Sequence, residues 1–231
     1  MFKNHTIIYL LFGFVALLDI ISIEFFPGMR YFTKPLLMPL LMLAYFLEAR
    51  PLGFFSIMLL SGLFFSWLGD ILLMLEELDG SFFIGGLVSF LTAHLLYIGY
   101  FAKTKSPRNS YLKSRPVMLL AVLAYIIELM YILWPTLGGM KIPVVIYGFV
   151  IGTMLSFALW QIGKIDKKAA TLFSAGAAFF VLSDSLLAIN KFRSQFSYAG
   201  MAIMFTYCLA QYLIARGSAR HLETSSTSAK D

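Results

Sequence analysis

The sequence contains very little cysteine, histidine and charge. Cys208 is its single cysteine, which excludes an intramolecular disulfide and a CxxC metal or redox motif. The three histidines, His5, His94 and His221, are too scattered to form a zinc motif. The P-loop, GxSxG and HExxH signatures are also absent from the sequence. The sequence therefore predicts a protein without a metal or an organic cofactor.

Apolar residues are abundant where charge is scarce. Hydrophobic residues make up 60% of the 231 residues, charged residues only 13%, and the mean hydropathy is +0.82. A soluble domain of this size could not bury so much apolar surface, so lipid is the expected solvent for most of the chain. The net charge of +6 does not indicate a nucleic-acid partner, because the basic residues lie in short loops between apolar segments.

Eight apolar runs are close to the length of a membrane-spanning helix, which needs roughly 20 residues. The sequence predicts these helices near 6–26, 34–48, 53–75, 82–101, 116–134, 142–161, 169–189 and 197–215. The second run carries Pro35 and Pro39, which predict a kink or a tilt. We therefore expect an all-α polytopic membrane helix bundle, with 1–216 as one transmembrane domain and 217–231 as a polar, flexible tail.

Lysine and arginine are distributed unevenly between alternate loops. An even number of helices places both termini on one side of the membrane. That side holds thirteen basic residues: Lys3, Arg50, Lys103, Lys105, Arg108, Lys113, Arg115, Lys164, Lys167, Lys168, Arg216, Arg220 and Lys230. The other side holds five: Arg30, Lys34, Lys141, Lys191 and Arg193. Because cytoplasmic loops retain positive charge, both termini are predicted to be cytoplasmic, at the inner membrane if the host is a bacterium.

Five ionisable residues fall inside the predicted spans, namely Asp19, Asp70, His94, Glu128 and Asp184. Such a group costs on the order of 2.5 to 3.5 kcal/mol to insert into a bilayer, so each one is a candidate functional residue. Asp19 and Glu128 have no polar neighbours in sequence, and we expect an interhelical partner or a position near the membrane interface for each.

The surroundings of two aspartates repeat. Residues 65–73 and 179–187 share the pattern Phe-x-x-Leu-(Gly/Ser)-Asp-x-Leu-Leu, centred on Asp70 and Asp184. These aspartates are four helices apart, so their helices run in the same direction and place the carboxylates at similar depth. The pattern fits an internal four-plus-four duplication; chance is the alternative, because Leu and Phe are common throughout the chain.

Small residues precede both aspartates. Gly69 and Ser183 permit close helix approach, which would allow Asp70 and Asp184 to share a cavity. Two nearby carboxylates in a site of low dielectric constant cannot both ionise easily, so such a pair can supply a general acid and a general base. The alternative for each aspartate is a purely structural hydrogen bond to a neighbouring helix.

Other polar side chains occur in pairs at helical spacing. His94 and Tyr97 share a face of the fourth predicted helix, and Tyr207 and Gln211 share a face of the eighth. His94 fits a proton carrier, a residue that orients a carboxylate, or a satisfied interhelical donor. Its predicted depth is ~10 Å further from the outer surface than that of the aspartates, at a rise of about 1.5 Å per residue.

Several motifs together resemble the YhhN family of membrane proteins, whose animal members are lysoplasmalogenases. The matching segments are Thr33-Lys-Pro-Leu36, Leu68-Gly-Asp-Ile-Leu-Leu73, Gly86 to His94 with Tyr97, Tyr147 to Met154, Leu182-Ser-Asp-Ser-Leu-Leu-Ala188, and Tyr207 with Gln211. They recur in order from about residue 33 to 215. The combination is more specific than any single segment.

The resemblance implies an eight-helix hydrolase that cleaves the vinyl ether bond of choline or ethanolamine lysoplasmalogens, giving a fatty aldehyde and a glycerophospho-base. Its catalytic carboxylates would be Asp70 and Asp184. The remaining site residues, expected to contact the substrate, are Lys34, His94, Tyr97, Tyr147, Tyr207 and Gln211. Lys34 is expected at the outer membrane edge, either as a ligand of the lipid phosphate or as a snorkelling lysine.

Two other functions fit the residues alone. Paired intramembrane carboxylates and an internal repeat also suit a proton-coupled transporter of a small amphiphile. A non-catalytic lipid-binding membrane protein is the second alternative. The expected partners are a lysophospholipid substrate and membrane lipid, and the sequence does not determine the oligomeric state.

Overall fold

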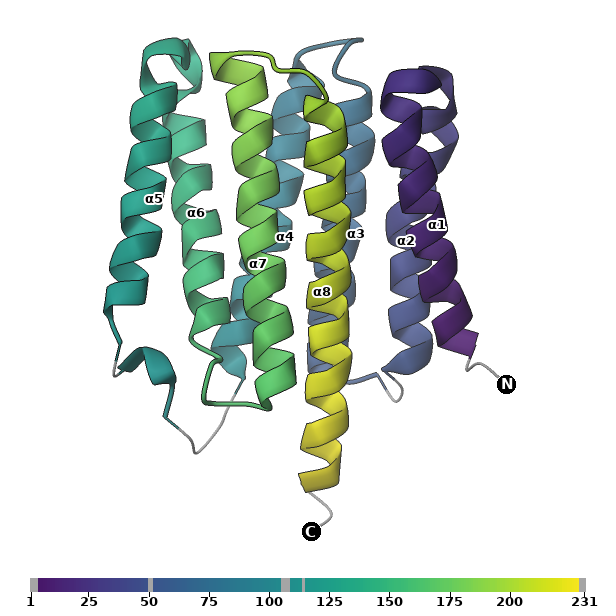
Figure 1. The fold of residues 1–231 in the computed structure, drawn as a ribbon, viewed down its shortest axis with the longest axis vertical. Helices are drawn as coiled ribbons and strands as arrows, with labels where there is room; N and C mark the ends of the chain where they lie inside the picture. Colours follow the sequence, from purple (N-terminus) through teal and green to yellow (C-terminus); the bar gives the residue numbers. More distant parts are fainter. Residues whose placement is uncertain (1–3, 50–51, 105–108, 114, 229–231) are drawn as a thin grey trace. The chain divides into compact units, whose positions relative to one another are not determined.

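The computed structural model describes residues 4–49, 52–104, 109–113 and 115–228, and it describes the side chains only as far as residue 225. These ranges hold eight α-helices and no strand (Figure 1). The helices are α1 (Asn4–Phe25), α2 (Arg30–Glu48), α3 (Phe54–Met74), α4 (Ser81–Lys103), α5 (Val117–Leu133), α6 (Lys141–Leu159), α7 (Lys167–Ala188) and α8 (Ala199–Ser228). The predicted all-α fold is confirmed. Lys3, Arg50, Lys105, Arg108 and Lys230, which the charge count uses, lie outside the described residues.

Six of these helices are long and apolar enough to cross a membrane. α2 and α8 do not meet that criterion of length and composition. α2 contains two internal prolines, and α8 continues into the polar segment at the end of the chain. The chain is therefore a multi-pass integral membrane protein in which two of the eight helices are less apolar than the rest.

The chain divides into two compact units, which are described separately here. The first unit comprises residues 1–100 and 218–231, and the second comprises residues 101–217. Asp70 lies in the third helix of the first unit, and Asp184 lies in the third helix that begins in the second unit. The four-plus-four duplication stays a prediction.

The first unit is built on α1, α2, α3 and α4. Its core includes Leu37, Met38 and Leu41 of α2 and Leu63 of α3, none of which is exposed to solvent. A glycine allows α4 to approach α3 closely, since a Cβ on Gly69 would lie 2.7 Å from the ring of Phe90. The small residue beside Asp70 is thus needed for helix packing, as the sequence predicted.

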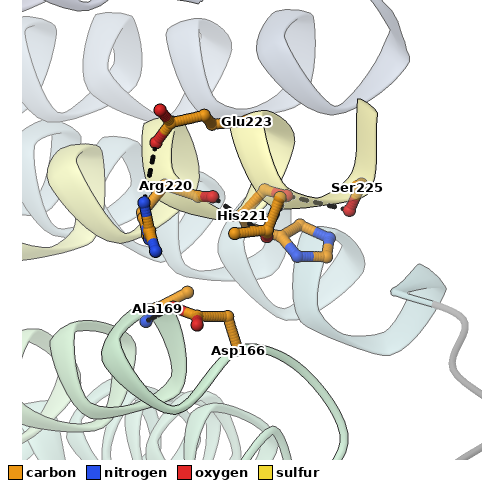
Figure 2. A network of polar contacts seen from close by, with 7 residues as sticks. Asp166, Ala169, Arg220, His221, Glu223 and Ser225 are labelled. Atoms are coloured by element: carbon orange, nitrogen blue, oxygen red, sulfur yellow. Dashed lines mark hydrogen bonds and ion pairs between the residues drawn. The ribbon is translucent and has the colours of Figure 1, made fainter. Parts of the chain in front are cut away.

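The end of α8 belongs to the first unit and differs from the expected flexible tail. The helix runs to Ser228, and the hydroxyl of Ser218 bonds to the phenol oxygens of Tyr45 at 2.8 Å and Tyr100 at 2.9 Å. The ring of His221 packs edge-on against Phe55 and Tyr100. These packing contacts of Ser218 and His221 stabilise the segment as a helix. Further along, Arg220 donates to the Glu223 carboxylate at 3.0 Å (Figure 2).

The second unit contains α5, α6, α7 and most of α8. Asp166 caps α7, because its Oδ2 accepts the backbone N–H of Ala169 at 3.1 Å (Figure 2). α7 and α8 approach closely where a Cβ on Gly176 would lie 3.0 Å from the carbonyl oxygen of Ala210. Ser183, the small residue beside Asp184, donates to the carbonyl oxygen of Ile203 at 3.0 Å. The register of α8 on α7 is set by these contacts.

Candidate functional site

Asp70 forms a buried ion pair with Lys34. Asp70 lies about one turn before the end of α3, and Lys34 lies about one turn after the start of α2. These consecutive helices pack together and run antiparallel, so the two turns are level with each other. The Lys34 Nζ is 3.5 Å from the Asp70 Oδ1, and the two side chains are only 8% and 3% exposed. Lys34 therefore supplies the counter-charge that a buried carboxylate requires.

Lys34 lies about one turn from the start of α2, and its expected place at the outer membrane edge stays a prediction. Its ammonium is directed at Asp70 within the unit, because the start of α2 packs against the end of α3. A snorkelling lysine would keep its charge in the aqueous interface. The direct role of Lys34 in binding the lipid phosphate stays a prediction.

Asp184 accepts a hydrogen bond from a neutral side chain. The phenol of Tyr147 donates to the Asp184 Oδ2 at 2.7 Å. Tyr147 lies near the start of α6, and Asp184 lies about one turn before the end of α7. The construction repeats that of the first unit: a donor early in one helix meets an aspartate late in the next. The first pair joins two charged groups at 3.5 Å, whereas the second is a hydrogen bond from a neutral donor at 2.7 Å.

The histidine and tyrosine of α4 lie further from the turn between α3 and α4 than Asp70 does. Phe90 packs on Gly69, and Tyr97 fills the space that Gly62 leaves. This antiparallel register places His94 level with about residue 65, which is ~8 Å along the helix axis from Asp70 at about 1.5 Å per residue. Both His94 and Tyr97 are fully buried. The depth offset expected for His94 is therefore present in the packing of α4 on α3.

Tyr207 and Gln211 lie beside the helix of Asp184. The ring of Tyr207 packs edge-on against Phe180, with centroids 5.6 Å apart, and Phe180 precedes Asp184 by one turn. Gln211, one turn further along α8, is fully buried. In the register set by Ser183 and Ile203, Tyr207 is about one turn and Gln211 about two turns from Asp184. These side chains belong to the second unit, whereas Lys34, His94 and Tyr97 belong to the first.

Two contacts at the start of α2 were not predicted as part of the site. Asp19 is fully buried in α1 and accepts the hydroxyl of Thr33 at 2.7 Å, which confirms the interhelical partner expected for it. The indole N–H of Trp67 donates to the carbonyl oxygen of Pro35 at 2.9 Å. Thr33, Lys34 and Pro35 thus each bond to a neighbouring helix. The spacing of Pro35 and Pro39 was the available signal for the Trp67 contact, because Pro39 has no N–H to offer the Pro35 carbonyl.

Comparisons with known proteins place the chain in a family. The model of the YhhN family matches residues 29–218, which include all of α2 to α7 and most of α8. The chain belongs to the YhhN family.

Named relatives of this YhhN chain come from animals and from bacteria. Lysoplasmalogenase TMEM86B of Homo sapiens is 34% identical over 184 residues, covering 79% of the chain and 73% of the relative. Lysoplasmalogenase TMEM86A of Homo sapiens is 30% identical over 194 residues, covering 77% and 74%. A lysoplasmalogenase of Mycobacterium bovis is 28% identical over 212 residues, covering 87% and 77%. No solved structure matches the YhhN chain.

Proposed function

We propose that the protein is a membrane-embedded hydrolase that cleaves the vinyl ether bond of lysoplasmalogens, yielding a fatty aldehyde and a glycerophospho-base. The relatives named lysoplasmalogenase support the substrate class. The observation that carries the chemistry is the pair of aspartates with unlike partners, Asp70 with the ammonium of Lys34 and Asp184 with the phenol of Tyr147.

The reaction needs an acid, a stabilising negative charge and a water molecule. A proton added to the β-carbon of the vinyl ether turns its α-carbon into an oxocarbenium ion. Water adds to that α-carbon and gives up one proton, forming a hemiacetal. Collapse of the hemiacetal breaks the bond between the α-carbon and the glyceryl oxygen, and the glyceryl oxygen takes a proton. One water is consumed, and the oxygen from water stays with the aldehyde.

The two partners suggest different roles for the aspartates. Lys34 favours an Asp70 carboxylate that carries its charge, which suits stabilisation of the oxocarbenium ion and removal of a proton from water. Asp184 accepts a hydrogen bond from a neutral phenol, and a phenol donor is compatible with a carboxyl group that holds a proton, which suits the general acid. Tyr147 would then orient the acid toward the β-carbon. His94, Tyr97, Tyr207 and Gln211 are proposed to contact the substrate.

The test is release of fatty aldehyde from choline and ethanolamine lysoplasmalogens by the purified protein. Asp184→Asn and Asp70→Asn are each expected to lower kcat by roughly 10²- to 10⁴-fold, the usual contribution of a positioned acid or base. Tyr147→Phe is expected to lower kcat less, because the carboxyl group remains. Asp79→Asn is the matched control, since Asp79 lies in the exposed turn between α3 and α4, where it accepts the local N–H of Ser81.

Isotopic water separates this route from attack at the glyceryl carbon. In H₂¹⁸O, the glycerophospho-base is expected to contain no ¹⁸O, because its oxygen comes from the ether. Label in the glyceryl hydroxyl, or undiminished activity in both aspartate variants, would contradict the mechanism. Proton-driven uptake of an amphiphile into vesicles, with no aldehyde from any vinyl ether lipid, would favour the transporter.

A further inference from the structure

The start of α2 is held against α3 at two consecutive residues. Lys34 reaches Asp70, and the carbonyl oxygen of Pro35 accepts the indole N–H of Trp67. Trp67 and Asp70 are three residues apart in α3, so they share one face of that helix. Two adjacent residues of α2 therefore meet two residues on a single face of α3, which fixes both the height and the rotation of α2 at this point.

The tryptophan contact exists because of a proline. In an α-helix the carbonyl of residue 35 accepts the N–H of residue 39, but residue 39 is proline and has no N–H. The Pro35 carbonyl is therefore left without its helical donor, and Trp67 supplies one from the neighbouring helix at 2.9 Å. A hydrogen bond that would ordinarily lie within α2 has become a bond between α2 and α3.

We propose that Trp67 is a positioning residue that holds the Lys34 ammonium on Asp70, acting through the main-chain carbonyl of Pro35. The part of this proposal that concerns activity rests on the hydrolase function proposed above. Asp19 holds the same segment from the opposite helix, through the hydroxyl of Thr33 at 2.7 Å. With Thr33 tied to α1 and Pro35 tied to α3, the residue between them has its backbone fixed on both sides.

The key variant is Trp67→Phe, which keeps an aromatic ring and removes the N–H. We expect kcat to fall roughly 10- to 100-fold, the scale of loss for a catalytic group displaced by about 1 Å, with a much smaller change in KM. Trp160→Phe, at the end of α6, is the matched control and is expected to retain wild-type kcat and KM. An unchanged kcat in Trp67→Phe would overturn the proposal.

A second substitution tests whether Trp67 positions Lys34 or only supplies a hydrogen-bond donor to the Pro35 carbonyl. Pro39→Ala restores the N–H of residue 39, so the double variant Trp67→Phe/Pro39→Ala gives the Pro35 carbonyl a donor within α2. We expect the double variant to regain thermal stability while kcat stays low, because the tie to α3 is still missing. Full recovery of kcat would show that Trp67 only satisfies the carbonyl, and would overturn the proposal. Pro39→Ala alone is expected to stay near wild-type activity.

A readout independent of substrate distinguishes failure of this proposal from failure of the proposed function. Acylation of the Lys34 amine by a membrane-permeable reagent is quantified by mass spectrometry in the folded protein. We expect Lys34 to be protected in the wild type and several-fold more reactive in Trp67→Phe and in the double variant. Equal reactivity in wild type and Trp67→Phe would overturn the proposal even if the enzyme is active. Increased reactivity supports the positioning role even if no aldehyde is formed.

Discussion

At the scale of single residues, the aspartates Asp70 and Asp184 differ in their partners. Lys34 and Tyr147 both lie near the start of a helix and both reach an aspartate near the end of the next. A lysine gives its aspartate a full positive charge, whereas a tyrosine gives its aspartate only a hydrogen bond. The same backbone arrangement thus gives one aspartate a charged partner and the other a neutral hydrogen-bond donor.

The first prediction concerns the ion pair. Lys34→Met removes the Lys34 counter-charge from the buried Asp70 and is expected to lower the free energy of unfolding by about 3–5 kcal/mol. Lys34→Met/Asp70→Asn is expected to recover much of that loss, because it removes both charges. Unfolding in mixed micelles for the wild type, both single variants and the double variant gives the coupling free energy. Strictly additive losses would argue against the pair.

The sequence indicated several of these residues but not their partners. Asp70 and Asp184 were found because an ionisable residue is costly in an apolar helix. The ion pair between Lys34 and Asp70 was not predicted. Whether these two side chains meet depends on how α2 and α3 are rotated about their own axes, and hydropathy contains no information about that rotation. Trp67 was missed for a related reason: its partner is a carbonyl that only the absence of an N–H at Pro39 makes available.

At the scale of helices, close approach depends on glycine beside the functional residues. A Cβ on Gly69 would lie 2.7 Å from the ring of Phe90, so Gly69→Ala must displace that ring or push α4 away from α3. We expect this change to lower the free energy of unfolding by about 1–3 kcal/mol, the usual cost of overpacking. Gly13→Ala in α1 is the control, because nothing lies within 4 Å of its added Cβ. The thermal midpoints of the two variants measure the contrast, and equal midpoints would contradict the packing argument.

The C-terminal part of α8 gives a prediction about pH. Burial lowers the pKa of His221 below its ordinary value of 6.5. The folded protein therefore binds this proton less readily than the unfolded chain, so stability is retained above about pH 6.5 and lost as the pH falls below that value. His221→Phe is expected to reduce the loss between pH 7 and pH 5, measured by thermal unfolding. His5→Gln is the control and should keep the full loss, because it leaves His221 in place.

The sequence predicted the helix boundaries more accurately than it predicted the structure of the last segment. Most predicted spans agree with the observed helices to within a few residues, since apolar runs ending at glycine, proline or charge mark the edges of spans. The composition of the segment after residue 216 predicts a polar and flexible tail. Its hydroxyl and imidazole groups instead pack on Tyr45, Tyr100 and Phe55, and composition alone carries no information about such contacts.

At the scale of the whole molecule, the number of helices constrains the topology. If all eight helices cross the bilayer, the two termini lie on one side, and the excess of lysine and arginine on that side predicts the cytoplasm. The family match and the names of the relatives carry no information about orientation. The sidedness of the termini therefore stays a prediction with a direct test.

That test uses the scarcity of cysteine. Cys208 is the single cysteine, so Cys208→Ser gives a background free of thiols. A cysteine at Ser225 is expected to be shielded from a membrane-impermeant maleimide in intact cells and labelled after permeabilisation. A cysteine at Asp79, in the turn after α3, is expected to be labelled without permeabilisation. The reverse pattern would invert the topology.

The hydrogen bond between Trp67 and Pro35 also gives the protein an intrinsic fluorescent probe. The chain has three tryptophans, and Trp134→Phe together with Trp160→Phe would leave Trp67 as the only indole emitter. Indole emission responds to the loss of a hydrogen bond and to the entry of water, so the spectrum of this variant would report when the start of α2 separates from α3. Substrate binding, turnover and lipid composition could then be followed in real time from inside the membrane, on the face of α3 that carries Asp70, without an attached dye.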